Sequence, residues 1–467
     1  MNNMTDTLNN EFIEELQSSN VAIVGIGMSG MSALRFLLNK GVFPKVFDSR
    51  LTPPVAEKDQ QFLNQVERKF GEFKLDEFKE FDYVIVSPGI SLKEPALANA
   101  QRYNENVFCD VELFARINTK PVIAVTGSNG KSTVVAWLED FLGRMGKNAV
   151  ACGNFGVPVL DVIEYGYNGE PVDVYIMELS SFQLESTHSL ICEAATVLNV
   201  TPDHMDRYES FSEYGRSKLR IYHHSKLCLY NNDDFETKPL LNCNKVHAFG
   251  TEAQSRAENY WYFNNETEDL CLNNEVIGNL GQLSLSGSHN GLNAIVVLAL
   301  ANAIGVDPVA EFHNLSHFSG LPHRCKFIAD ANGVLFVDDS KATNIASTQA
   351  ALNGLSKNDN KNIVLIAGGD AKGADLSELQ ADINKHVKKV IAFGKDKTKF
   401  VDFLKPEQLV LVSNMSEAVN QSMKLVEQGD IVLLSPACAS IDMYKNYQHR
   451  GADFKQNVLA AISGLNK

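Results

Sequence analysis

The chain has 467 residues, of which 44% are hydrophobic and 21% are charged, as is typical of a globular protein with more than one core. It carries 57 acidic and 42 basic residues, a formal net charge of -15 at pH 7, and no basic stripe, which makes nucleic acid an unsuitable partner. No apolar signal sequence and no run of about 18 apolar residues occurs, so we expect a cytoplasmic protein with no membrane partner.

The eight cysteines are scattered along the chain. They form no CxxC pair and have no histidine at zinc-ligand spacing. For a cytoplasmic protein this pattern predicts reduced thiols.

The first motif is GxGxxG after an apolar run. Residues 21–24 predict a strand, and Gly25, Gly27 and Gly30 lead into a helix predicted over 31–39. A strand at 45–47 then ends at Asp48, where a dinucleotide-binding domain has its ribose-binding carboxylate. An NAD-dependent oxidoreductase is therefore one interpretation. Because only one more clear strand, at 83–87, follows, we favour a small Rossmann-like unit for a nucleotide-type ligand.

The strongest motif is VIAVTGSNGKST at residues 122–133. An apolar strand, a glycine loop and a helix pattern from 134 onward succeed one another, although valine replaces the first glycine of the full P-loop pattern. Such a loop directs backbone N–H groups and the positive end of a helix dipole at a polyphosphate. Lys131 then reaches the terminal phosphates, and the hydroxyl of Ser132 or Thr133 joins a Mg²⁺ shell.

Two later strands deliver polar residues to the same sheet edge. A strand at 173–179 presents Glu178 at its carboxyl end, the place of a Mg²⁺ ligand in P-loop enzymes. A strand at 195–200 leads into a loop with Asp203, His204 and Asp206. Lys218 lies in a helical pattern, where a plain surface lysine is the default interpretation. Residues 258–278 alternate aromatic and polar side chains and predict a strand meander at an edge.

The last part of the chain predicts another doubly wound α/β domain. Strands are expected at 334–338, 363–367, 389–393, 408–412 and 431–434. Three of them end in polar clusters, at 338–344, 368–372 and 435–440. Any one of these clusters is explained by a helix cap or a turn. Three at one sheet edge favour a binding site.

Together these motifs resemble the Mur ligase family, across essentially the whole chain. The resemblance rests on TGSNGKST (126–133), GNFG (153–156), ELSSFQLE (178–185), LNVTPDHMDRY (198–208), KLRIY (218–222), GLPHR (320–324), DSKATN (339–344), GGDAKGAD (368–375) and SPACASID (435–442). The first domain, with SPGI at 87–90, and the SPACAS loop point to the D-glutamate-adding branch.

The resemblance implies an α/β protein of three domains. These are a Rossmann-like UDP-substrate domain (1–109), a P-loop-type central ATPase domain (110–320) and a Rossmann-like C-terminal domain for the amino acid and part of the nucleotide (321–467). The implied enzyme is a monomeric ATP-dependent amide-forming ligase of cytoplasmic peptidoglycan precursor synthesis. It would join D-glutamate to UDP-N-acetylmuramoyl-L-alanine (UDP-MurNAc-L-Ala) through an acyl phosphate.

The resemblance also implies roles for individual residues. The catalytic set would be Lys131, Glu178, His204 and Lys218. Two Mg²⁺ sites would use Ser132, Glu178, His204 and Lys218, the last carried as a carbamate, which turns a repelling ammonium into an oxygen ligand. ATP would contact Gly127, Ser128, Asn129, Gly130, Lys131, Ser132, Thr133, Asn290, Asn293, Arg324 (phosphates) and Asp339 (ribose).

The other two substrates have implied contacts as well. The UDP-substrate would be bound by Ser29, Asp48, Ser49, Arg50, Ser87 and Asn154, and D-glutamate by Thr343, Lys372, Ser440 and Tyr447. Tyr447 stands where the branch commonly has Phe, and Ser49 where it commonly has Thr. Both departures are mild, because the expected contacts are made by backbone or hydroxyl groups.

Three other functions stay open on sequence alone. A ligase of the same family for another amino acid, or a folylpolyglutamate-type ligase, shares the ATPase core, although the DNPR-type loop of a diaminopimelate or lysine ligase is missing. An NAD-dependent oxidoreductase leaves the phosphate loop, Glu178 and His204 without a role. A non-catalytic nucleotide-gated switch would keep the loop and lack the reaction.

Overall fold

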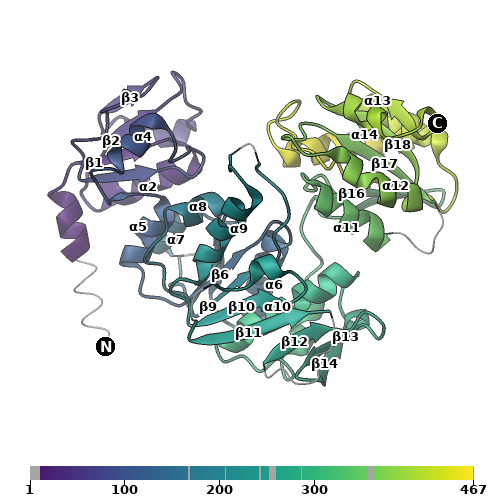
Figure 1. Cartoon of the computed structure of the whole chain (residues 1–467), viewed down its shortest axis with the longest axis horizontal. Helices are drawn as coiled ribbons and strands as arrows, with labels where there is room; N and C mark the ends of the chain where they lie inside the picture. Colours follow the sequence, from purple (N-terminus) through teal and green to yellow (C-terminus); the bar gives the residue numbers. More distant parts are fainter. Residues whose placement is uncertain are drawn as a thin grey trace.

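The computed structural model describes residues 11–166, 169–205, 207–240, 243–251, 259–285, 287–355 and 361–465. Figure 1 shows three lobes, each built on its own sheet, with the central lobe between and below the other two. The sheets have five, nine and six strands in chain order. The three-domain α/β architecture expected from the sequence is confirmed. Within the described residues, no helix is long and apolar enough to cross a membrane.

The first sheet is entirely parallel, in the order β3-β2-β1-β4-β5. Its strands are β1 (Val21–Val24), β2 (Lys45–Asp48), β3 (Arg68–Phe70), β4 (Tyr83–Val86) and β5 (Val107–Phe108), and its helices are α2 (Met28–Asn39), α3 (Gln60–Leu63), α4 (Pro95–Ala100) and α5 (Asp110–Ile117). Helix α2 begins three residues earlier than predicted, so Gly30 lies in its first turn. A side chain there would come within 1.9 Å of the carbonyl oxygen of Gly25, which explains the third glycine of the motif.

The central sheet has the order β14-β13-β12-β11-β10-β9-β6-β8-β7. Its strands are β6 (Val122–Thr126), β7 (Ala149–Gly153), β8 (Val174–Glu178), β9 (Ala194–Val197), β10 (Leu227–Asn231), β11 (Lys245–Gly250), β12 (Tyr260–Phe263), β13 (Asp269–Leu272) and β14 (Glu275–Asn279). The antiparallel ladder β12-β13-β14 confirms the predicted edge meander. Strand β6 lies between β9 and β8, so the loop after it faces the ends of both neighbours.

Helices cover the central sheet on both faces. They are α6 (Lys131–Arg144), α7 (Val159–Tyr165), α8 (Ser181–Glu185), α9 (Phe211–Leu219), followed by the 3-10 turn η2 (Arg220–Tyr222), and α10 (Ser288–Ala303). Trp137 of α6 and Trp261 of β12 are fully buried in one core with α10. This packing holds α6, and therefore the phosphate loop before it, rigidly against the sheet.

The third sheet has the order β15-β16-β20-β17-β18-β19. Its strands are β15 (Lys326–Ala331), β16 (Val334–Asp338), β17 (Ile363–Gly368), β18 (Val387–Phe393), β19 (Leu409–Leu411) and β20 (Ile431–Leu434), with helices α11 (Ile345–Leu355), α12 (Gln380–His386), α13 (Met415–Leu425) and α14 (Tyr447–Leu465). The five predicted strands are present. The sequence did not predict β15, which is antiparallel to β16 and forms the edge.

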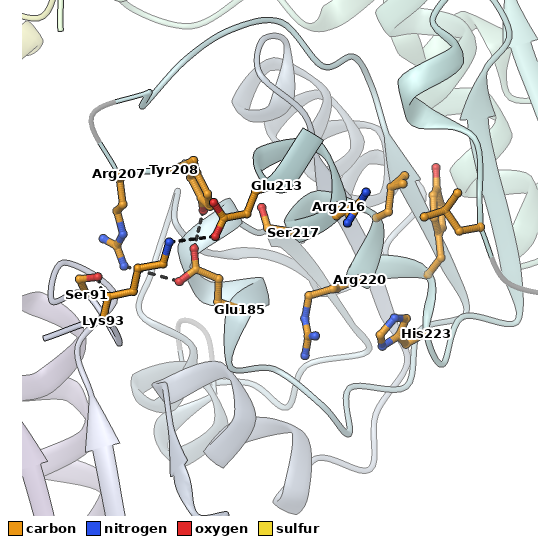
Figure 2. A pocket seen from close by; sticks show the side chains of 13 residues that line it. Ser91, Lys93, Glu185, Arg207, Tyr208, Glu213, Arg216, Ser217, Arg220 and His223 are labelled. Carbon is orange, nitrogen blue, oxygen red and sulfur yellow. Dashed lines mark hydrogen bonds and ion pairs between the residues drawn. The ribbon is translucent and has the colours of Figure 1, made fainter. Parts of the chain in front are cut away.

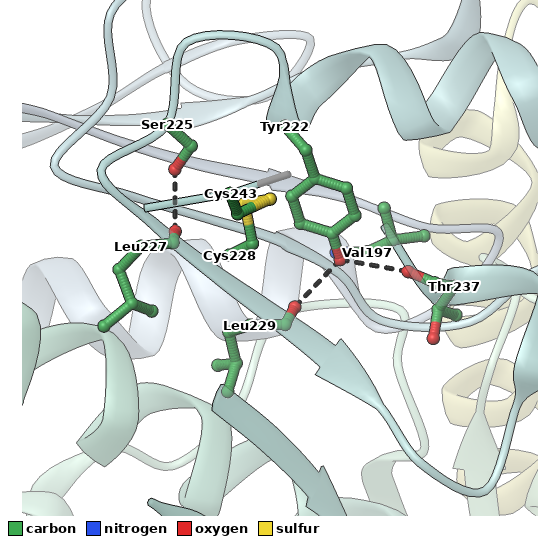
Figure 3. Close-up of a disulfide and its surroundings, with 8 residues drawn as sticks. All are labelled: Val197, Tyr222, Ser225, Leu227, Cys228, Leu229, Thr237 and Cys243. Carbon is green, nitrogen blue, oxygen red and sulfur yellow. Dashed lines mark hydrogen bonds between the residues drawn. A yellow bond between two sulfur atoms is a disulfide. The ribbon is translucent and has the colours of Figure 1, made fainter. Parts of the chain in front are cut away.

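One expectation about the cysteines is wrong. Cys228 of β10 forms a disulfide with Cys243, which precedes the neighbouring parallel strand β11 (Figure 3). Their Cα atoms are 6.2 Å apart, inside the range that a disulfide spans. A separation of 15 residues carries no recognisable motif, so only the pairing of β10 with β11 brings the two thiols together. Five of the six free cysteines are buried, and burial raises the pKa of the Cys192 thiol to about 12.

Candidate active site

The phosphate loop connects β6 to α6 as predicted, but the helix starts earlier. Helix α6 begins at Lys131, three residues before the predicted start, and Gly130 before it has a left-handed φ of 85°. A side chain at Gly130 would approach within 3.1 Å of Asn293 Oδ1, so only glycine fits both the backbone and the space. Lys131, Ser132 and Thr133 form the first turn, whose N–H groups have no partner within the helix. This turn is an anion-binding end of a 14-residue helix.

Two lysines converge on one carbonyl group of this loop. Lys131 Nζ donates to Gly127 O at 2.7 Å and to Ser128 O at 3.0 Å. Lys218 Nζ, on α9, donates to the same Gly127 O at 2.9 Å. Burial lowers the pKa of Lys131, and burial together with the charge of Lys131 holds the pKa of Lys218 well below its usual value. Lys218 is thus no surface lysine: it is 2% exposed, and burial disfavours its charged form.

Glu178 ends β8 beside the phosphate loop and is 2% exposed. Its Oε1 accepts a hydrogen bond from Asn154 Nδ2 at 2.7 Å, while its Oε2 has no partner among the described residues. A buried carboxylate oxygen without a partner costs free energy unless a cation or donor completes it. Glu178 therefore suits a metal ligand. No group of three or more His, Cys, Asp and Glu side chains converges in the described parts of the chain, so other oxygen donors would have to complete such a site.

The loop after β9 carries Asp203 and His204, whereas Asp206 lies outside the described residues. His204 has a left-handed φ of 56°, and its ring meets the edge of Phe182 with centroids 5.0 Å apart. Asp203 accepts from Lys372 Nζ and Asn344 Nδ2, both at 3.4 Å. Although burial acts in the opposite direction, the charge of Lys372 and further partners lower the pKa of Asp203. This ion pair joins the central domain to the C-terminal domain.

Three further hydrogen bonds cross the same boundary. Asn129 Oδ1, in the phosphate loop, accepts from Ser347 Oγ at 2.6 Å and from Asn344 Nδ2 at 3.1 Å. Arg324 Nη2 donates to Ser132 Oγ at 2.8 Å. The C-terminal domain therefore touches the predicted phosphate-binding and metal-binding groups directly.

The C-terminal strand ends supply a buried acid, Asp339, and a half-buried base, Lys341. Asp339 accepts from Ser435 Oγ at 2.7 Å and from the Cys325 N–H at 3.2 Å, and burial raises its pKa to about 7. Lys341 was not predicted as a site residue, although it lies within the DSKATN motif. Burial, with the charge of Arg324, lowers its pKa to about 8, and its Nζ lies 4.2 Å from the ring centroid of Tyr447.

Three cavities meet around these residues. One of about 240 Å³ is shared by the phosphate loop and α9 on one side and the C-terminal domain on the other. It brings together all of the predicted catalytic and metal-binding residues and several predicted substrate contacts, with Lys341 in addition: Ser128, Asn129, Gly130, Lys131, Ser132, Asn154, Glu178, His204, Lys218, Arg324 and Thr343. The predicted catalytic residues thus share one enclosed space.

A second cavity, of about 350 Å³, has the mixed lining that a nucleotide needs. Apolar walls come from Leu198, Phe249, Leu292 and Val296, and the predicted ATP contacts on it are Asn129, Gly130, Thr133, Asn290, Asn293, Arg324 and Asp339. Asn293 Nδ2 donates to Asn290 Oδ1 at 3.3 Å. The predicted adenine side and the predicted phosphate side are therefore continuous.

The predicted D-glutamate residues fall into two groups. Thr343 and Lys372 line a third cavity, of about 180 Å³, together with Asp203 and His204. Ser440 and Tyr447 line none of these three cavities. Ser440 is 4% exposed, and the Tyr447 ring packs near Lys341 and His323. In this arrangement only half of the predicted set faces the space beside the catalytic residues.

The predicted UDP-substrate residues lie mostly at the strand ends of the first sheet. Asp48 accepts from the Ile26 N–H at 2.9 Å and from Arg50 Nε and Nη2 at 2.8 and 2.7 Å. These bonds lower the pKa of Asp48 against the opposing effect of burial. Ser49 follows it on the surface, Ser29 bonds Asp110, and Ser87 follows β4. Asn154 lies apart from them, in the central domain, where its side chain donates a hydrogen bond to Glu178.

The chain is similar to known proteins along nearly its whole length. Family models match in three consecutive parts: "Mur ligase MurD-like, N-terminal domain" over residues 19–109, "Mur ligase middle domain" over 125–301 and "Mur ligase, glutamate ligase domain" over 323–438. Two curated relatives are named UDP-N-acetylmuramoylalanine--D-glutamate ligase. The protein from Pseudoalteromonas translucida is 42% identical over 96% of this chain and 99% of its own. The protein from Escherichia coli K12 is 39% identical over 94% and 98%.

Solved structures agree on the fold. A UDP-N-acetylmuramate-alanine ligase from Thermotoga maritima aligns with a TM-score of 0.58 at 18% identity, over 95% of this chain and 100% of that one. A MurF ligase from the same organism, in complex with ADP, aligns with a TM-score of 0.60 at 16% identity, over 91% and 96%. With relatives of about 40% identity along nearly its whole length, three matching domains in the family's order, and a lysine loop that faces the last domain, the chain belongs to the Mur ligase family.

Proposed function

We propose that the chain is an ATP-dependent ligase that joins D-glutamate to UDP-MurNAc-L-Ala in peptidoglycan precursor synthesis. ATP, UDP-MurNAc-L-Ala and D-glutamate would give ADP, phosphate and the amide. Support comes from relatives that bear this enzyme's name at 42% and 39% identity over nearly the full chain. The last domain matches a model named for the family's glutamate ligase domain, and the first matches the MurD-like N-terminal domain.

The observation that carries the proposal is the cavity shared between the central and C-terminal domains. Lys131 from one side and Arg324 and Lys341 from the other gather in a protein whose net charge is -15. A carboxylate is a poor electrophile, because its charge repels an amine and oxide does not leave. Converting it to an acyl phosphate requires two anionic substrates to meet, and clustered cations allow this.

The proposed chemistry has two steps. The alanine carboxylate oxygen attacks the γ-phosphorus of ATP and ADP leaves, while Lys131 and Arg324 stabilise charge on the phosphoryl oxygens. The free amine of D-glutamate then attacks the carbonyl carbon, the C–O bond to phosphate breaks and the amine loses a proton. Lys372, now 3.4 Å from Asp203, would exchange that partner for a D-glutamate carboxylate, and Thr343 in the same cavity would donate to it. Ser440 and Tyr447 would complete the amino-acid contacts.

The residues present fit magnesium. Oε2 of Glu178 has no partner among the described residues, and Ser132 Oγ and His204 share its cavity, so these groups would hold the metal, with Lys218 as a further ligand if carbamylated. When bound, Mg²⁺ would neutralise phosphate oxygens during transfer. The lowered pKa of Lys218 favours the neutral amine, the form that adds to CO₂ to give a carbamate and a proton. Its burial would protect that product from water.

The cellular location, the oligomeric state and the domain boundaries are further parts of this proposal. A ligase that consumes ATP and UDP-linked substrates would work in the cytoplasm. The monomeric state and the domain boundaries at 109/110 and 320/321 stay predictions.

Phosphate release is the decisive measurement. With ATP, Mg²⁺ and UDP-MurNAc-L-Ala present, D-glutamate should start release, whereas L-glutamate and diaminopimelate should not. Lys131→Ala should lose the activity, and Lys120→Ala, a control on an exposed lysine just before β6, should keep it. Release that responds only to diaminopimelate would indicate another ligase of the family. D-glutamate-dependent release that persists in Lys131→Ala would refute the role of the loop.

A further inference from the structure

A fourth cavity lies against α9, on a different face of that helix from Lys218, and belongs to none of the sites above. It measures about 440 Å³, larger than each of the three cavities at the domain boundary. Lys93 of the first domain and residues of α8, α9 and η2 line it (Figure 2). Its volume lies within the roughly 300–1,000 Å³ of pockets that hold small molecules. No role assigned so far uses this space.

Helix α9 presents different faces to the two sites. Glu213, Arg216 and Ser217 line the fourth cavity, whereas Tyr214 and Lys218 line the catalytic cavity. Residues three or four apart share a helix face, so one rigid helix separates the two spaces.

The charge in this cavity is positive. Four basic residues line it, Lys93, Arg207, Arg216 and Arg220, against two acidic ones, Glu185 and Glu213; Glu209, outside the lining, also pairs with Lys93 at 3.3 Å. Both carboxylates are already bonded: Glu185 accepts from Tyr208 OH at 2.5 Å, and Glu213 accepts from Lys93 at 2.9 Å. Figure 2 shows these pairs toward one end, with Arg216 and Arg220 toward the other.

The two arginines at that second end differ in their contacts. Arg220 donates to Leu184 O at 2.6 Å and to Thr187 O at 3.3 Å. Arg216 is exposed and forms no ion pair with a residue that the structure describes. Beside the two arginines, the rings of Tyr208 and Tyr222 and the apolar side chain of Leu219 form a wall of the cavity. An anionic group next to a flat apolar body matches this lining.

Aromatic contacts connect this wall to the catalytic loop. Tyr208 stacks on Phe182 with centroids 6.0 Å apart and packs on Tyr214 at 5.3 Å. Phe182 meets His204 at 5.0 Å, and Tyr214 OH lies 3.0 Å from Ser128 Oγ of the phosphate loop. Displacement of Tyr208 would therefore move groups on both sides of the phosphate loop.

We propose that this cavity is a second ligand site, for a small ring-bearing molecule that carries a phosphate group, and that its occupancy changes the catalytic site through α9 and Tyr208. The phosphate would bind at Arg216 and Arg220, and the ring would lie against Tyr208 and Tyr222. The site goes beyond the proposed ligase activity, and binding to it is measurable whether or not that activity exists.

The test uses 1-naphthyl phosphate as the probe on the full chain, followed by calorimetry or ligand-observed NMR. Saturable binding is expected, with 1-naphthol at least about tenfold weaker because it lacks the charge-assisted bonds, and 1-naphthoate separating phosphate from carboxylate preference. Arg216→Glu should weaken phosphate binding at least about tenfold, and Arg216→Lys should retain most of it. Arg102→Glu, at an exposed arginine outside the cavity, is the matched control and should change nothing.

Three results would overturn the proposal. The first is absence of saturable binding, or equal weakening by Arg216→Glu and Arg102→Glu. The second is displacement of the probe by UDP-MurNAc-L-Ala or ADP, which would make the cavity an extension of the substrate sites. The third, which refutes the coupling, is binding that leaves both the rate of phosphate release and hydrogen exchange in α9 unchanged. A protein with no ligase activity would still give the binding and exchange results, so the two proposals fail separately.

Discussion

Asp339 gives the C-terminal domain a pH-dependent stability that can be isolated by one substitution. Burial, with a smaller contribution from the charge of Asp338, raises the pKa of Asp339 from 3.8 to about 7 against bonds from Ser435 and Cys325. Between these two values the folded chain keeps a proton that the unfolded chain has lost. The protonated carboxyl of Asp339 therefore makes its full contribution to the free energy of unfolding below pH 3.8. This contribution is lost as the pH rises toward 7.

The size of the effect follows from that window. Each pH unit inside it lowers the free energy of unfolding by about 1.4 kcal/mol, so from pH 5 to pH 7 the loss is about 2 kcal/mol. Asp339→Asn stays neutral in both states and removes this dependence. Its amide oxygen can still accept from the Cys325 N–H, and its NH₂ can donate to Ser435 Oγ, which donates to Thr348 Oγ1 at 3.1 Å.

Native-state hydrogen exchange is the suitable assay, because three lobes need not unfold together and a global melting curve would mix them. Protection of the β16 and β20 amides, corrected for the intrinsic pH dependence of exchange, should fall by about 2 kcal/mol from pH 5 to pH 7 in the wild-type protein and stay level in Asp339→Asn. Asp402→Asn, at an exposed carboxylate of the same domain, is the control. Equal slopes in the wild-type protein and Asp339→Asn would refute the assignment of the proton to this residue.

Four further outcomes are expected. Lys131→Ala should lower phosphate release at least about 100-fold in a steady-state assay, while circular dichroism stays unchanged. Lys372→Met should raise the KM for D-glutamate and leave the KM for ATP within about twofold; a matched rise in both would place Lys372 elsewhere. Ser347→Ala removes a bond to Asn129 and should weaken nucleotide binding by about 1 kcal/mol, about fivefold in Kd by calorimetry. Cys243→Ser opens a loop of 15 residues and should lower the unfolding free energy of the central domain by about 3 kcal/mol without reductant; with reductant the two proteins should be alike.

The strands that carry the predicted catalytic groups were predictable from sequence to within a few residues. Strands β6 and β8 are buried on both faces, so each is an uninterrupted apolar run that ends where a polar residue begins. This is why Glu178 was placed correctly at a strand end. The start of α6 was missed because Lys131, Ser132 and Thr133 interrupt the apolar pattern, although they occupy the first helical turn.

Other features depended on partners that are distant in sequence. The edge strand β15 mixes charged and apolar residues, and it is a strand only because β16 pairs with it. The disulfide required the β10-β11 pairing. Lys341 lay in a recognised motif, but its position beside Tyr447 follows from packing of α14 against the sheet. GxGxxG alone also pointed to NAD, and it was the remainder of the chain that identified the family.

The hydrogen bonds of Lys131 have a consequence for how long products stay bound. With its ammonium engaged by Gly127 O and Ser128 O, Lys131 would exchange existing bonds for those to a phosphate rather than add new ones. The net contribution of Lys131 to phosphate affinity is then the difference between two similar sets of contacts. Release of a bound phosphate would return the lysine to these two carbonyl groups, which would favour rapid turnover over tight retention.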